Sequence, residues 1–256
     1  MIVFDAVTKT YEGRRVVGPL SLSIPDGQFV AFLGASGCGK TTSLKMINGL
    51  VTPDGGTVSV AGRAVGEEPL PILRRRIGYV FQEVGLFPHM TVAENIAVSP
   101  RLARWPPARI SARTDELLSL IALPSDVAGR LPAALSGGQR QRVGLARALA
   151  AGPALMLMDE PFGALDPLTR DALGQDYRAL HERLGLTTVM VTHDILEALL
   201  LSDRVIVLDA GRIVADGAPV ELLADHADPL VRALMEAPRR QMRRLEVLQA
   251  GDAARG

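Results

Sequence analysis

Residues 29–42 combine a short apolar run, a glycine-rich turn and a helix-forming segment, in the order FVAFL, GASGCG and KTT. The turn and the residues after it match G-x-x-x-x-G-K-[ST], the pattern of a phosphate-binding loop, or P-loop. Gly34, Gly37 and Gly39 allow backbone conformations that a Cβ forbids, so successive N–H groups can point at a phosphate. A helix that starts near Lys40 adds the positive end of its dipole. An ordinary glycine-rich turn is the alternative, but strand, loop, Lys, Thr and helix all occur in the expected order.

The side chains after the turn fit the same chemistry. Lys40 is expected to reach the β- and γ-phosphates as a compact charge, and the Thr41 hydroxyl is expected to ligate Mg²⁺. Only three of the 28 basic residues are lysines, so a chain that nearly always uses Arg has Lys at this position. The predicted nucleotide-binding residues of this loop are Gly34, Ser36, Gly37, Cys38, Gly39, Lys40, Thr41 and Thr42.

Composition limits the possible partners of the chain and the cellular compartment in which it works. Basic and acidic residues are equal at 28 each, which disfavours a nucleic-acid-binding surface. Cys38 is the single cysteine, so an internal disulfide is excluded and a reducing compartment is expected. No apolar run approaches the roughly 18–20 residues of a membrane span. The first residues also lack the charged and apolar regions of a secretory signal.

The apolar runs predict an α/β fold. Strands are expected at 2–7 and 16–24, before the strand that feeds the P-loop, and further β-like runs occupy 57–60 and 77–80. Runs at 154–158, 187–191 and 205–208 alternate with helices at 168–184 and 195–201, as in a parallel sheet covered on both faces. Between the runs at 77–80 and 154–158, helices are expected at 92–98, 110–122 and 139–151, with a connecting loop at 100–107. The prediction is a P-loop NTPase core with a mostly parallel sheet, an N-terminal antiparallel β subdomain and an inserted α-helical subdomain.

Two carboxylates follow the apolar run LMLM, at Asp159 and Glu160. The end of a buried strand places them at the carboxyl edge of the sheet, where ligands of open α/β folds bind. Asp159 is the candidate Mg²⁺ carboxylate, and Glu160 is the candidate general base for an attacking water. An Asp-Glu pair alone would be an ordinary helix-start signal.

A second candidate phosphate site is the sequence LSGGQ at residues 135–139, directly before a predicted helix. Small residues there let backbone N–H groups approach an anion. The contributing residues are Ser136, Gly137, Gly138 and Gln139. Two phosphate-binding helix ends far apart in one chain favour a head-to-tail pair of chains, in which each P-loop faces the other chain's LSGGQ segment.

The P-loop, LSGGQ, the Asp159-Glu160 pair, the sequence ALD at 164–166 and His193 occur in the order found in ABC transporters, and residues 2–220 resemble their ATP-binding subunit. The resemblance implies that Gln82 senses Mg²⁺ and the attacking water, that Asp166 contacts the partner chain, and that His193 binds the γ-phosphate. It also supports Tyr11 as an aromatic that stacks on adenine, although a locally packed turn tyrosine is the alternative. The resemblance implies an ABC ATPase domain over 1–217, with the helical subdomain at about 83–151 and a short helical C-terminal extension at 218–256.

The implied activity is ATP hydrolysis with ATP and Mg²⁺ in a head-to-tail homodimer. The implied partners are membrane permease subunits and, indirectly, a substrate-binding protein, at the cytoplasmic face of the plasma membrane. Phe87 is a candidate contact for a membrane subunit, or a core residue. Stretches such as IGYVFQ and GLFPHMTVAENI resemble those of bacterial importers of quaternary-amine osmoprotectants such as glycine betaine, choline and carnitine. Importers of other cargo and soluble non-transport ABC ATPases are the alternatives.

Overall fold

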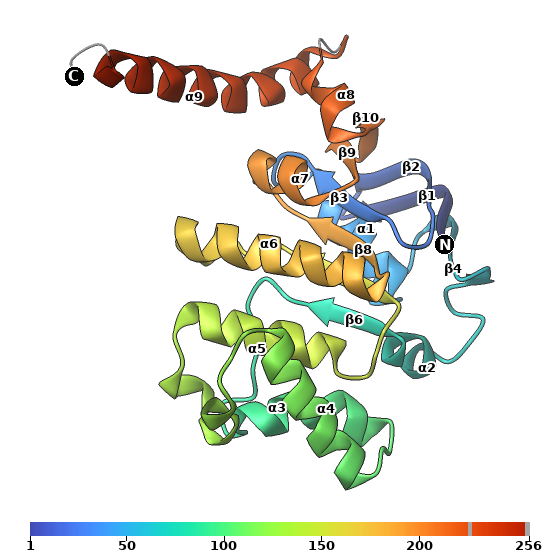
Figure 1. Cartoon of the computed structure of the whole chain (residues 1–256). Coiled ribbons are helices and arrows are strands. Elements are labelled where there is room, and N and C mark those ends of the chain that lie inside the picture. Colours follow the sequence, from blue (N-terminus) through green and yellow to red (C-terminus); the bar gives the residue numbers. More distant parts are fainter. Residues whose placement is uncertain (225–226, 254–256) are drawn as a thin grey trace.

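The chain forms two β-sheets in the parts that the computed structural model describes, residues 1–224 and 227–253 (Figure 1). The smaller sheet is antiparallel, with the strand order β2-β1-β4-β5. Its strands are β1 (Ile2–Tyr11), β2 (Arg14–Ile24), β4 (Gly55–Val60) and β5 (Arg63–Ala64). Glu12 and Gly13 both have positive φ, as the tight turn between β1 and β2 requires. The predicted antiparallel N-terminal part is confirmed, with longer strands because the β1–β2 pairing continues into polar residues.

The larger sheet has the strand order β10-β9-β3-β8-β7-β6. Its strands are β3 (Phe29–Leu33), β6 (Ile77–Val80), β7 (Leu155–Asp159), β8 (Thr187–Val191), β9 (Arg204–Asp209) and β10 (Arg212–Gly217). All neighbouring strands are parallel except β10, which pairs antiparallel with β9 at the edge. The mostly parallel sheet predicted from the apolar runs is therefore confirmed.

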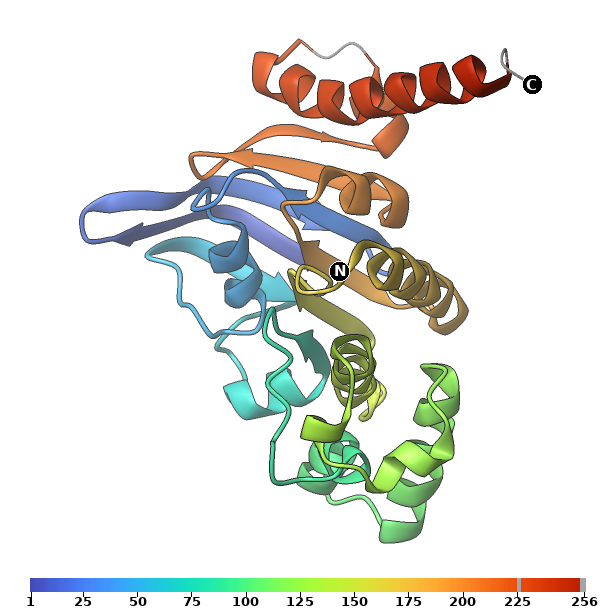
Figure 2. The same cartoon turned by 90° about the vertical axis from the view of Figure 1, so that its left-hand side faces the viewer.

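Strand β3 shows why this sheet must be covered on both faces. Phe29, Ala31 and Leu33 join one apolar cluster, together with helical residues, while Val30 and Phe32 join a second cluster on the antiparallel-sheet side. Successive side chains of a strand point to opposite faces, and here both sets are buried. Helix α1 (Lys40–Ile47) lies on one side of the sheet, and α6 (Pro167–Leu184) and α7 (Ile195–Leu201) lie on the other (Figure 2).

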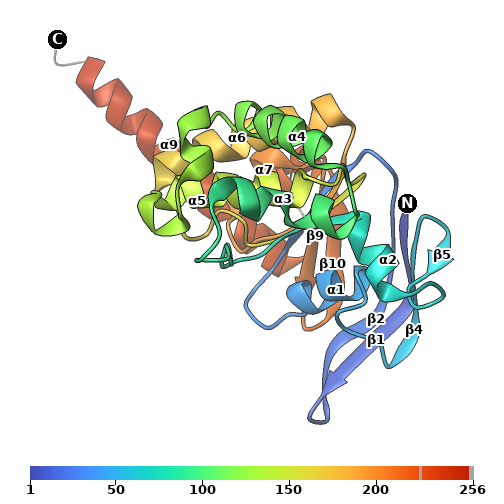
Figure 3. The same cartoon turned by 90° about the horizontal axis from the view of Figure 1, so that it is seen from below.

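The inserted segment between β6 and β7 is helical. It contains α3 (Val92–Leu102), α4 (Pro107–Leu120), α5 (Gly137–Leu149) and the 3₁₀ turns η1 (Ser125–Gly129) and η2 (Pro132–Ala134); the short α2 (Leu70–Arg75) precedes β6. Figure 3 shows α3, α4 and α5 gathered on one side of the molecule. Helix α3 begins at a capping box of Thr91 and Glu94 and runs through Pro100, where the sequence predicts a loop. Pro100 lies in the last turn of the helix and is buried.

The C-terminal part contains α8 (Pro219–Leu223) and the 25-residue α9 (Pro229–Ala253). The sequence predicts only short helices here, so the length of α9 differs from that prediction. Val231 and Met235 of α9 are buried in the same cluster as residues of β3 and α6. The far end of α9 extends away from the rest of the molecule (Figure 1). Residues 225–226 and 254–256 of the predicted extension lie outside the described residues.

The buried position of Met235 generates a stability prediction. Met235→Ala removes apolar atoms from a filled core and should cost about 2–4 kcal/mol. For a chain of this size the melting temperature should fall by roughly 5–15 °C, measured by thermal unfolding followed by circular dichroism. Arg243→Ala, at an exposed position of the same helix, is the control and should leave the melting temperature nearly unchanged. Equal melting temperatures for both variants would show that α9 does not stabilise the core.

Candidate active site

The P-loop connects the end of β3 to the start of α1. Gly34 has a φ of +153°, and a Cβ there would lie 2.2 Å from the carbonyl oxygen of Leu208. Gly39, with a φ of +102°, would place a Cβ 2.5 Å from the carbonyl oxygen of Val16. The neighbouring backbone leaves no room at either position, so both glycines are required by close approach as well as by φ.

Lys40 is almost fully buried at the first position of α1. Its ammonium donates hydrogen bonds to the carbonyl oxygens of Gly34, at 2.7 Å, and Ala35, at 2.9 Å. The thiol sulfur of Cys38 lies 3.8 Å from the same nitrogen. These contacts hold a positive charge within the loop, where a phosphate would compete with the two carbonyls for it.

Two oxygen donors meet beside the loop. The Thr41 hydroxyl donates to a carboxylate oxygen of Asp159 at 2.8 Å, and Asp159 is buried at the end of β7. Tyr79 of β6 is a neighbour that sequence reasoning missed. Burial raises the pKa of its phenol, and the Asp159 carboxylate raises it further. Nothing in the sequence pattern singled out Tyr79, because an aromatic residue in a strand is usually a packing residue.

Glu160 is the centre of a second cluster. Its carboxylate accepts a hydrogen bond from the Gln82 amide at 3.1 Å, and the Nδ1 of His193 lies 3.2 Å from the same oxygen. The Glu160 backbone has a φ of +47° and donates its N–H to the carbonyl of Val191. Left-handed conformations of non-glycine residues are strained and concentrate at functional sites. The structure therefore brings together the three residues predicted as catalytic.

The LSGGQ segment forms the N-terminus of α5. The Ser136 side chain accepts from the Gln139 N–H at 3.2 Å, and the Gln139 side chain accepts from the Ser136 N–H at 2.9 Å. A Cβ on Gly138 would lie 2.7 Å from the Thr169 side chain, so this glycine lets α5 approach the start of α6. Within the described chain, no hydrogen bond joins residues 135–139 to the P-loop.

Two further predicted residues also lie apart from the P-loop contacts. Asp166 caps α6 by accepting from the Thr169 N–H at 3.0 Å, and hydrogen bonds from the Thr169 side chain and N–H lower the pKa of its carboxyl. Tyr11 is 45% exposed at the end of β1, with the Lys9 ammonium 5.4 Å from its ring centroid. Their roles, like those assigned to Ser36, Gly37, Thr42 and Gly137, remain predictions.

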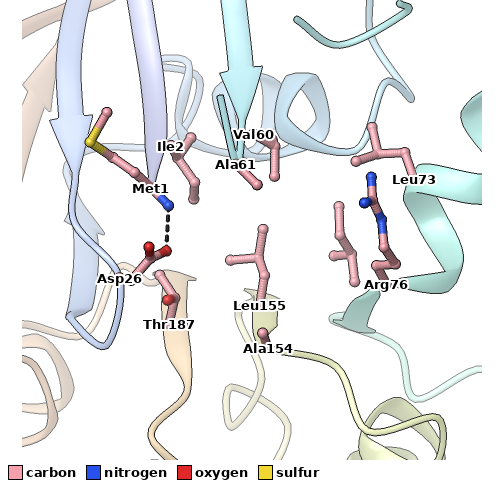
Figure 4. Close-up of a pocket in the computed structure, with 11 residues that line it drawn as sticks. Met1, Ile2, Asp26, Val60, Ala61, Leu73, Arg76, Ala154, Leu155 and Thr187 are labelled. Atoms are coloured by element: carbon pink, nitrogen blue, oxygen red, sulfur yellow. Dashed lines mark hydrogen bonds and ion pairs between the residues drawn. The ribbon is translucent and has the colours of Figure 1, made fainter. Parts of the chain in front are cut away.

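A separate cavity of about 150 Å³ lies at the opposite edge of the sheet (Figure 4). Leu155 and Thr187, which line it, are the first residues of β7 and β8. Asp26 on its rim is paired with the Met1 ammonium. Ligands of parallel sheets bind at the carboxyl ends of the strands, which is the edge that holds the P-loop and Glu160.

The comparisons with known proteins match this geometry. The family profile described as ABC transporter covers residues 17–163. This chain belongs to the ABC transporter family. The Escherichia coli glycine betaine uptake system ATP-binding protein YehX is 47% identical over 100% of this chain and 83% of its own length. The Bacillus subtilis choline transport ATP-binding protein OpuBA is 47% identical over 90% of this chain and 61% of its own length.

One further relative is named for another cargo, and a solved ATP-binding cassette shares the fold. A Vibrio cholerae sulfate/thiosulfate import ATP-binding protein, CysA, is 48% identical over 87% of this chain and 60% of its own length. The dimeric ATP-binding cassette MJ0796, solved in a post-hydrolysis state with ADP and Pi, has a TM-score of 0.77 and 33% identity, covering 86% of this chain and 99% of that structure. This chain thus spans about three fifths of the length of OpuBA and CysA. In the described residues, none of the helices has the length and apolar character needed to cross a membrane.

The contacts of Lys40 generate a binding prediction for this ABC protein. Lys40→Ala removes the only side-chain ammonium within the P-loop and should weaken ATP binding by about 100-fold or more, because charged hydrogen bonds to phosphate contribute about 1.5–3 kcal/mol each. Equilibrium titration with a fluorescent ATP analogue measures the loss. Lys45→Ala, in the last turn of the same helix, is the matched control and should bind within about twofold of wild type. Equal affinity of the two variants would contradict the phosphate role of Lys40.

Proposed function

We propose that this chain is the ATP-hydrolysing subunit of an ABC importer and works as a head-to-tail dimer. The observation that carries the proposal is the convergence of Gln82 and His193 on one carboxylate oxygen of Glu160, beside the P-loop. A phosphate-binding loop alone binds nucleotide. A carboxylate at the same sheet edge, held between an amide and an imidazole, adds a group that can activate water.

Three of the predicted site residues offer oxygen ligands of the kind that Mg²⁺ binds. Thr41, Asp159 and Gln82 offer a hydroxyl, a carboxylate and an amide oxygen, which are the hard ligands that Mg²⁺ prefers. The described residues contain no group of three or more His, Cys, Asp or Glu side chains that could hold a metal. Mg²⁺ in nucleotide sites uses one or two carboxylates together with phosphates, so the Thr41–Asp159 pair fits it. Bound Mg²⁺ would neutralise phosphate charge.

The protein's own groups then divide the work of hydrolysis. Glu160 accepts the proton of an attacking water, and the Gln82 amide, which touches its carboxylate, orients that water. His193 and Lys40 donate to the γ-phosphate and stabilise the charge that develops on its oxygens. Positioned donors and charges are the main source of catalysis in phosphoryl transfer.

The second phosphate contact comes from a partner copy in this proposal. Ser136, Gly137, Gly138 and Gln139 open α5, apart from the P-loop contacts of the same chain. In a head-to-tail dimer each α5 N-terminus closes the other chain's nucleotide site, with Asp166 at the contact. The MJ0796 cassette, which was solved as a dimer, supports a dimeric assembly. Tyr11 would stack on the adenine from the exposed end of β1.

The role of Glu160 is tested by Glu160→Gln. Without the carboxylate the hydrolysis rate should fall by about 1000-fold, while ATP binding and dimer closure persist. Size-exclusion chromatography with ATP and Mg²⁺ should show a stable dimer, and a phosphate-release assay should show almost no turnover. Glu83→Gln, an exposed neighbour of Gln82, is the control and should hydrolyse ATP normally. Normal turnover by Glu160→Gln would exclude Glu160 as the base.

The contact with a membrane subunit is proposed at the surface around Phe87. Phe81 and Phe87 are 46% and 41% exposed and line a groove of about 290 Å³, together with Arg147. The Arg147 guanidinium donates to the carbonyls of Val84 and Gly85, both at 2.7 Å. Large exposed aromatic residues over a fixed backbone suit a protein partner. Phe87 is therefore exposed, so the alternative interpretation of Phe87 as a core residue is wrong.

The proposed cargo is a quaternary-amine osmoprotectant, because relatives named for glycine betaine and choline match most of this chain. The similar identity to the sulfate/thiosulfate protein makes an importer of another cargo the second candidate. The proposed organisation is an ABC ATPase domain at 1–217, with a helical subdomain at about 83–151 and an extension at 218–256. Its proposed place is the cytoplasmic face of the plasma membrane, with a substrate-binding protein delivering cargo to the permease.

The cargo is tested by uptake of labelled glycine betaine, choline, carnitine and sulfate at high osmolarity. Cells that carry the intact gene with its permease should accumulate a quaternary amine, and cells with Lys40→Ala should lose that uptake because nucleotide binding is lost. Lys45→Ala is again the control. If the Lys40→Ala cells lost only sulfate uptake, the result would instead support the second candidate, an importer of another cargo.

A further inference from the structure

Arg170 lies in the first turn of α6 and joins two loops that are distant in sequence. One guanidinium nitrogen, Nη2, donates to the carbonyl oxygen of Leu165 at 3.1 Å. The other, Nη1, donates to a carboxylate oxygen of Asp194 at 3.0 Å. Leu165 directly precedes Asp166, and Asp194 directly follows His193. One side chain thus connects the proposed partner contact with the loop that carries His193.

Asp194 is itself fixed from several sides. Its second carboxylate oxygen accepts from the Glu197 N–H at 3.2 Å and caps α7, and its own N–H donates to the Thr192 hydroxyl at 3.0 Å. The Asp194 carboxylate is therefore tied to the first turn of α7, and the Asp194 backbone is tied to the Thr192 side chain on the other side of His193.

The orientation of the His193 ring depends on the backbone of residues 192–194. Its side chain is 64% exposed, so burial does little to orient the ring, although Nδ1 lies 3.2 Å from the Glu160 carboxylate. An exposed side chain samples several rotamers unless its backbone and contacts hold it. The Asp194 anchor narrows the positions from which the ring can reach Glu160.

We propose that Arg170 is a positioning residue that couples the segment before α6 to the orientation of His193. The inference rests on the proposed function in one respect, the contact of Asp166 with a partner chain. A shift of residues 165–166 on dimer closure would pull on the guanidinium, and the guanidinium would carry the shift to Asp194. The site that binds the partner and the site that hydrolyses ATP are then linked through one side chain.

The geometry explains why arginine is needed here. Its planar fork presents two N–H groups in fixed directions, so one side chain can hold a carbonyl and a carboxylate at once. The third donor, Nε, is buried and makes no hydrogen bond. Native proteins rarely leave a buried donor unpaired, so the orientation favours the two Nη contacts at the expense of Nε. Lysine would keep the charge but lose the fixed pair of directions.

Arg178 offers a matched control on the same helix. Its guanidinium makes three polar contacts, with Glu182 at 2.9 Å, Asp203 at 2.7 Å and the Leu201 carbonyl at 3.0 Å. Two of these contacts hold α6 to the last residue of α7 and to Asp203 before β9, and none of the three includes the loop of His193. Arg178→Ala should therefore lower the melting temperature without a specific effect on His193.

The first test uses NMR signals of the histidine rings in the full chain without nucleotide, with His193 assigned by its loss in His193→Gln. Arg170→Ala and Arg170→Lys should both shift the His193 signals, whereas Arg178→Ala should leave them in place. This readout needs neither turnover nor dimer formation, so it remains decisive even if the proposed function fails. Unchanged His193 signals in Arg170→Ala would overturn the inference.

The second test is the steady-state ATPase rate. Arg170→Ala and Arg170→Lys should lower kcat by about 10-fold with KM for ATP nearly unchanged, because the P-loop is intact. Arg170 borders a cavity of about 210 Å³ between α6 and α7, so ethylguanidinium added to Arg170→Ala should restore part of kcat. Arg178→Ala should show neither effect at temperatures where it is folded. An unchanged kcat in Arg170→Ala, with an active wild type, would also overturn the inference and leave the proposed function standing.

Discussion

The site depends on the burial of one strand. All five residues of β3 are buried, and the strand is hydrogen-bonded to β8 on one side and β9 on the other. A shift of one residue would send every side chain to the wrong face of the sheet, so the register is strongly fixed. Gly34 follows directly, and its lack of a Cβ lets the chain pass close to Leu208. The polar backbone of the P-loop thus takes its position from the apolar packing beneath it.

Parallel pairing explains the second cluster in the same way. Val80 is in register with Met158 in the neighbouring strand, and Asp159 is in register with Val191. The residues that follow these strand ends, Gln82, Glu160 and His193, therefore arrive at one edge although 111 positions separate the first from the last. Because apolar strands set this placement, these side chains would need little reorganisation in the proposed hydrolysis.

The sequence predicted those parts of the molecule that follow from strong local patterns. The P-loop, the ends of β6 and β8, and the start of α7 were predicted closely, because glycine placement and continuous apolar runs leave few alternatives. Pro100 was misplaced in a loop, because a proline is a strong helix-ending signal and its burial in α3 depends on tertiary packing. The length of α9 was missed because a proline is a strong helix-ending signal, and this helix runs through Pro238. Arg170 was missed because its two partners lie 5 and 24 residues away, and no local pattern joins them.

The preference of this chain for arginine has a structural consequence that also explains Lys40. Arg74 donates to the carbonyls of Asn48 and Gly49 after α1, and Arg113 donates to those of Leu149 and Ala150 at the end of α5. Each fork binds two carbonyls at or just after a helix end, and its fixed geometry suits such paired contacts. Lys40 also holds two carbonyls, but through a single compact ammonium on a flexible stem. In the proposed site a phosphate would compete for this charge with the two carbonyls, and a compact ammonium suits that exchange better than the bulkier planar fork of arginine.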